Sequence, residues 1–84
     1  MNIPRFQLLR LHVAQLLHAS DPMLSPEGQL LMELRAYVNP APTQAEFDHV
    51  IERMEAARQI TRLRTEDEGV KTKLTDVGIA ELTR

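Results

Sequence analysis

The feature that most constrains the fold is a change in hydrophobic period near residue 60. Up to Gln59, apolar residues recur every three to four positions, which is typical of amphipathic helices. Over residues 60–65 and again over 70–75, apolar and polar residues alternate, which is typical of half-buried strands. The segment between the two runs ends in Gly69, which is free to take a positive φ in a turn. The sequence therefore predicts a β-hairpin that follows a helical region.

Helical segments account for the rest of the expected secondary structure. Apolar residues recur at helical spacing in three stretches before the hairpin, and a shorter stretch follows it. A chain of 84 residues is long enough for one domain and too short for two. We therefore expect a single α+β domain over residues 1–84, with helices at about residues 4–19, 25–38, 43–58 and 76–83.

Local start signals support three of these helices. Ser25 followed by Pro26 predicts an N-cap and a proline in the first turn. Thr43 and Glu46 have the spacing of a capping box, in which the hydroxyl and the carboxylate satisfy free N–H groups. Thr75 is expected to cap the last helix in the same way.

The first helix has a broader apolar arc than so short a helix usually needs. Leu8 and Leu11 add apolar surface on the flanks of its main stripe. One interpretation is a central helix that is contacted on several sides, and the other is a surface left for a second copy of the chain. The aromatic residues and three of the methionines are expected to fill the core, namely Phe6, Tyr37, Phe47, Met23, Met32 and Met54.

The segment that closes the hairpin resembles that of a known family. Leu74-Thr75-Asp76-Val77-Gly78-Ile79-Ala80-Glu81-Leu82 is similar to the Leu-Thr-x-x-Gly-x-x-x-Leu segment that closes the wing of bacterial regulators of the MarR and PadR types. Three helices followed by a two-stranded wing is also the order of their winged helix-turn-helix fold. The resemblance covers about residues 25–84 and implies that Gly78 allows close packing. The chain departs from these regulators in two ways: residues 56–59 lack their usual glycine, and their long additional helices are missing.

The resemblance implies a role for the third helix in double-stranded DNA binding. In the family this helix enters the major groove, where its N-terminal residues meet base edges. Gln44 would pair with adenine, Arg53 would contact guanine or phosphate, and Thr43 would hold a phosphate. The candidates on this helix are Thr43, Gln44, His49 and Arg53.

Acidic residues on the same helix favour a different interpretation. Asp48, Glu52 and Glu55 share one side of the helix, and Gln44 lies on that side as well. An acidic surface repels the DNA backbone unless it points elsewhere. A solvated amphipathic helix with a capping box therefore remains an alternative to base recognition.

The hairpin supplies a second set of basic candidates. With a four-residue loop over residues 66–69, all four of its cations would share one face, and Leu63 and Leu74 would share the other. Such a face suits an anion, nucleic-acid phosphate first and an acidic protein surface second. The alternative is a solvent face that keeps the strands soluble, with its charge neutralised by the acidic turn. The four cations are Arg62, Arg64, Lys71 and Lys73.

Composition argues against most catalytic and metal-dependent functions. The chain has no cysteine, its three histidines lie on different elements or six residues apart, and no glycine-rich phosphate loop is present. We expect no enzyme activity, no metal and no cofactor. No apolar run is long enough for a membrane span, and no small-residue cleavage signal follows the N-terminal apolar stretch, so the cytoplasm is the expected location.

Two functions therefore remain open at this stage. The first is a small DNA-binding module, such as a transcriptional regulator or accessory factor, that acts as a homodimer through its first helix. The second is a winged helix that binds proteins as an adaptor or subunit of a larger assembly. The net charge of −2 and the acidic third helix favour the second function.

Overall fold

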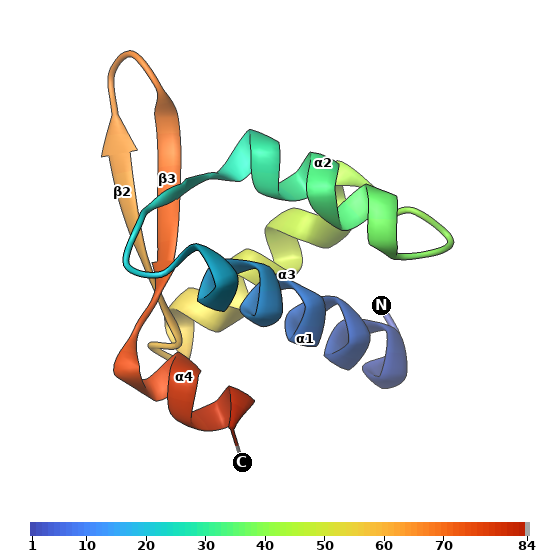
Figure 1. The fold of residues 1–84 in the computed structure, drawn as a ribbon. Coiled ribbons are helices and arrows are strands. Elements are labelled where there is room, and N and C mark those ends of the chain that lie inside the picture. The colour runs from blue at the N-terminus through green and yellow to red at the C-terminus, as the bar shows by residue number, and fades with distance from the viewer. Residues whose placement is uncertain (84) are drawn as a thin grey trace.

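The structure, a computed structural model, describes residues 1–83 and confirms an α+β fold. The β-hairpin stands at one end of the helices, and the N-terminus lies at the other end (Figure 1). Each predicted helix is present within a few residues of its expected bounds. The elements in chain order are α1 (Ile3–Ser20), β1 (Ser25–Pro26), α2 (Glu27–Tyr37), α3 (Gln44–Ala56), β2 (Ile60–Thr65), β3 (Gly69–Leu74) and α4 (Asp76–Leu82).

A third strand, which the sequence analysis missed, joins the hairpin. The sheet is antiparallel with the order β1-β3-β2, and Ser25 lies opposite Thr72. The prediction of Ser25 as an N-cap was wrong, because α2 begins at Glu27 and Pro26, at its N-cap position, makes no side-chain cap hydrogen bond. A two-residue edge strand tolerates proline, which has no N–H to contribute to the ladder. The two residues predicted to start the helix instead form strand β1.

The hairpin register differs by one residue from the expected one. Thr65 pairs with Gly69, and three residues rather than four separate β2 from β3. Gly69 has a φ of 74°, as predicted, which suits a three-residue loop that contains a left-handed glycine. The Thr65 hydroxyl donates to the Gly69 carbonyl at 2.7 Å and accepts from the Glu68 N–H at 3.1 Å, which stabilises this shorter loop.

This shift in register overturns the predicted basic face. A change of one residue moves every side chain of one strand to the other face relative to its partner. Arg62 and Arg64 now share a face with Thr72, whereas Lys71 and Lys73 lie opposite Leu63 and Thr61 on the other face. The four cations therefore do not lie together. Leu63 and Leu74 are also on opposite faces; Leu74 is buried and Leu63 is exposed.

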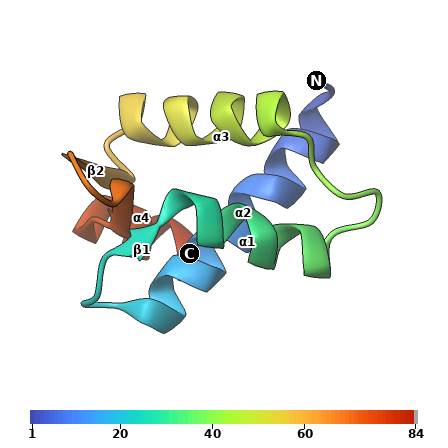
Figure 2. The ribbon, with the colours of Figure 1, turned by 90° about the horizontal axis from the view of Figure 1, so that it is seen from above.

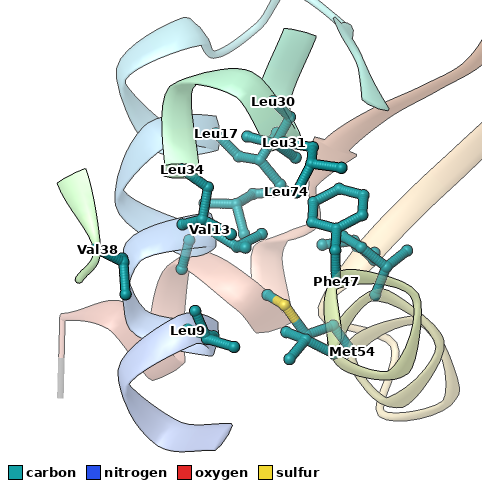
Figure 3. Packing of buried hydrophobic residues seen from close by; sticks show 14 residues of the cluster. Leu9, Val13, Leu17, Leu30, Leu31, Leu34, Val38, Phe47, Met54 and Leu74 are labelled. Carbon is teal, nitrogen blue, oxygen red and sulfur yellow. The ribbon is translucent and has the colours of Figure 1, made fainter. Parts of the chain in front are cut away.

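The core lies between the three long helices and the inner face of the sheet. In Figure 3 the labelled side chains of α1, α2 and α3 point toward one another, and Leu74 of β3 closes the cluster. The prediction that Tyr37 is a core residue was wrong, because it lies at the end of α2 and is 69% exposed. Met23 and Met32 are also exposed, whereas Phe47 and Met54 are buried as expected and Phe6 packs against the core.

The end of α3 forms a left-handed turn at a residue other than glycine. Arg58 takes the left-handed conformation, with a φ of 62°. Its N–H donates to the Glu55 carbonyl, and the Gln59 N–H donates to the Met54 carbonyl, both at 2.9 Å. This is the Schellman arrangement, which usually has glycine at the position that Arg58 occupies here.

Gly78 provides the close packing that the closing segment implied. A Cβ at this position would lie 2.2 Å from the Gln59 carbonyl oxygen and 2.7 Å from the Leu74 side chain. Its N–H donates to the hydroxyl of Thr75, which caps α4 as predicted. Within residues 1–83, no helix combines the length and the apolarity that crossing a membrane requires.

Candidate functional site

The candidates at the start of α3 are engaged within the helix itself. The Thr43 hydroxyl accepts from the Glu46 N–H at 3.1 Å, and the Glu46 carboxylate accepts from the Thr43 N–H at 3.1 Å, which confirms the capping box. The Gln44 side chain donates to the Asp48 carboxylate at 2.8 Å. A base or a phosphate would therefore have to compete with these contacts.

One side of α3 is acidic and open to solvent. In the perpendicular view, α3 runs along an edge of the molecule (Figure 2). Asp48, Glu52 and Glu55 are all exposed, and they follow one another at intervals of three to four residues. This side of the helix therefore presents carboxylates at the positions where a DNA-reading helix needs donors and cations.

Arg62 is held in a network of ion pairs on the inner face of the sheet, which it shares with the buried Thr72. Its guanidinium donates to both Glu27 carboxylate oxygens at 2.7 and 2.9 Å, and to Glu55 at 3.4 Å. The Thr72 hydroxyl donates to the same Glu27 carboxylate at 2.6 Å. The side chains of Arg62 and Glu27 are each only 13% exposed.

This network gives Arg62 a structural role. The hydrogen bonds that Arg62 donates to Glu27 contribute most to raising the pKa of Arg62 above its ordinary value. The bidentate pair joins the start of α2 to the sheet, and the weaker bond to Glu55 adds the end of α3. Arg62 is therefore bound within the molecule rather than presented to a ligand.

The other three hairpin cations, Arg64, Lys71 and Lys73, are divided between the two faces of the hairpin. Lys71 forms an ion pair with Glu68, which lowers the pKa of that exposed carboxyl. Arg64 is exposed on the face that Arg62 occupies, and Lys73 is half-buried on the opposite face. Neither Arg64 nor Lys73 has an ion pair among residues 1–83.

The remaining two α3 candidates lie toward α1. The His49 ring meets the Phe6 ring edge to face, with 5.8 Å between their centroids. Arg53 lines a hollow of about 190 Å³ together with Arg10 of α1, and Phe6 and Met54 contribute to its lining. The structure thus separates His49 and Arg53 from the acidic side that bears Gln44.

Arg10 was not among the site residues predicted from the sequence. It follows Phe6 by four positions, so the two side chains share a side of α1. This spacing was the sequence feature that could have pointed to Arg10. The spacing alone does not predict a site, because only the tertiary packing shows that this side of α1 meets the end of α3.

A second surface lies between α1 and the end of α2. A groove of about 250 Å³ is lined by His12, Gln15, Leu16 and Tyr37. Leu8 and Leu11, on the adjoining turns of α1, are 41% and 42% exposed. This part of α1 carries no Asp, Glu, Lys or Arg from residue 11 to residue 20.

The described residues show no metal centre, and the comparisons give no family. Among residues 1–83, no group of three or more His, Asp or Glu side chains is placed to hold a metal ion. Comparison with family models, with curated proteins and with solved structures found no match.

Proposed function

We propose that this chain is a winged-helix protein-interaction module whose partner at α1 is a second copy of the same chain. The helix order and the segment that closes the hairpin support the winged-helix assignment. The observation that carries the interaction is the exposed apolar surface of Leu8, Leu11 and Tyr37 beside an uncharged stretch of α1. Exposed apolar groups that lie together are typical of interaction sites.

A second copy is the occupant that this surface fits best. In a two-fold dimer the same patch lies on both subunits, so each charge would face its own sign near the axis. The apolar leucines avoid that repulsion, and Gln15 in the adjoining groove offers both a donor and an acceptor to its counterpart. A core of this size also leaves a small domain marginally stable, so self-association would add to its stability.

The charge distribution favours this function over DNA binding. The exposed side of α3 is acidic, and Arg62 is engaged by Glu27 and Glu55. The hairpin cations are divided between two faces. Few phosphate contacts are therefore available, and phosphate contacts provide most of the non-specific affinity of DNA-binding proteins.

The test is the mass of the protein in solution, measured by sedimentation over a range of concentrations. We expect a dimer for the wild type and a monomer for the variant that combines Leu8→Glu and Leu11→Glu. Met32→Glu is the matched control, because Met32 is 71% exposed but does not line the α1–α2 groove. A wild type that stays monomeric, or a double variant that stays dimeric, would overturn the proposal.

DNA binding remains the second candidate, and one observation favours it. Arg64 and Lys73 are without ion pairs among residues 1–83 and lie on the hairpin strands, where a wing would touch a DNA backbone. The test is binding to random duplex DNA at ~50 mM and ~200 mM salt. Affinity that falls steeply with salt and is lost in the variant Arg64→Ala with Lys73→Ala would support it, and no binding at the lower salt would exclude it.

A further inference from the structure

The hollow between α1 and the end of α3 combines positive charge with an apolar floor. Arg10 and Arg53 line it from the two helices, and Gln59 borders it from the link to β2. Phe6, Met54 and Ala57 provide the apolar lining. No carboxylate is among the described residues that line this hollow.

Neither arginine that lines the hollow is neutralised within the described part of the chain. Arg10 and Arg53 make no ion pair and no side-chain hydrogen bond among residues 1–83. Arg5, by contrast, donates to Glu46 and to the Pro40 carbonyl, and Arg62 is held by Glu27. Two guanidiniums without a partner among residues 1–83 thus line the same hollow.

We propose that this hollow binds a phosphate group. Both guanidiniums are charged at every relevant pH, and each presents several N–H donors in a planar fork that matches phosphate oxygens. Two positive charges also balance the two negative charges of a phosphate dianion, whereas a carboxylate would balance only one. The volume of about 190 Å³ is below the usual range for drug-sized ligands, so the site fits a small anionic group.

This site is separate from the α1 surface proposed for the second copy. The hollow is lined by Phe6 and Arg10, and the α1–α2 groove is lined by other residues of α1. A protein that dimerises without binding phosphate would therefore contradict only the phosphate site. A monomer that binds phosphate would contradict only the dimer.

The test is an NMR titration of the wild type with inorganic phosphate, at constant ionic strength maintained with chloride. We expect saturable shifts of the backbone amides near Arg10 and residues 53–59 and of the Arg10 and Arg53 Nε–H signals. Arg10→Gln and Arg53→Gln should each weaken binding about tenfold or more, because each removes charge-assisted hydrogen bonds. Arg64→Gln is the matched control, since it removes an exposed guanidinium that does not line the hollow. Thermal unfolding of each variant checks that the fold is intact.

Two further probes define the chemistry and the source of the phosphate. Acetate tests whether a carboxylate binds as well as phosphate does. Phenyl phosphate tests whether the apolar lining also binds an organic group attached to the phosphate. Tighter binding of phenyl phosphate would assign the site to phosphate monoesters, and equal binding would assign it to free phosphate. Shifts that do not saturate, equal affinity for acetate, or unchanged affinity in both arginine variants would each overturn the proposal.

Discussion

Arg62 and Arg53 were both predicted to contact DNA, and the structure gives them opposite surroundings. Arg62 lies against the carboxylates of Glu27 and Glu55, with its side chain 13% exposed. Arg53 is exposed at the hollow with Arg10 and has no ion pair among residues 1–83. The neighbouring elements therefore decide whether an arginine is structural or available to a ligand.

Replacing Arg62 should have the largest effect on stability. Arg62→Met leaves the Glu27 carboxylate partly buried without its bidentate partner, and only Thr72 would still donate to it. We expect a loss of about 2–3 kcal/mol in the free energy of unfolding, because an unpaired buried charge is costly. Urea unfolding at neutral pH measures it.

Arg53→Met is the matched comparison for that variant. It should change the free energy of unfolding by less than about 0.5 kcal/mol, as is usual for exposed side chains outside packed or paired sites. Adding Glu27→Leu to Arg62→Met should recover part of the loss, since no charge is then left without a partner. Equal destabilisation by Arg62→Met and Arg53→Met would contradict the structural role of Arg62.

The sequence predicted the elements well and the surfaces poorly, for a physical reason. The capping box at Thr43, the cap at Thr75 and the left-handed Gly69 are local features, and a few neighbouring residues determine each of them. The hairpin register depended on the loop length. Because the loop is one residue shorter than predicted, Arg62 lies on the inner face of the sheet. The Glu27–Arg62 pair joins residues 35 positions apart, so no local sequence pattern could predict it.

The Thr72 hydroxyl tests whether the carboxylate of Glu27 needs its second donor. Thr72 is fully buried and donates to Glu27 at 2.6 Å. Thr72→Val keeps the shape and the strand preference but removes this bond to a charged group, so we expect a loss of about 1.5–2 kcal/mol in the free energy of unfolding. Thr61→Val, on the exposed face of β2, is the control and should have little effect. Equal effects of the two substitutions would mean that the hydroxyl contributes nothing to the network.

The pair of Arg5 and Glu46 should make stability on the α1 side depend on pH. The Arg5 hydrogen bond, followed by the Thr43 N–H, lowers the pKa of Glu46 below its ordinary value of 4.5. A lowered folded-state pKa stabilises the fold above the ordinary value, and this contribution is lost as the pH falls through the lowered one. Glu46→Gln should therefore cost about 1 kcal/mol near neutral pH and less in acid. Urea unfolding at several pH values measures this, and a cost that is independent of pH would contradict it.

Arg58 lies between α3 and β2, and its replacement by glycine should have a small effect of the opposite sign. Its φ of 62° costs roughly 1 kcal/mol for a residue with a Cβ. Glycine removes this cost but gains entropy in the unfolded chain, so Arg58→Gly should raise the free energy of unfolding by about 0.5 kcal/mol. Arg58→Ala retains the strain and should not stabilise the protein, which separates the backbone effect from the loss of charge. Because Arg58 does not line the hollow, phosphate affinity should be unchanged in both variants. A stabilised glycine variant with lost phosphate binding would show that the link between α3 and β2, rather than Arg10 and Arg53 alone, determines the difference between the two sides of α3.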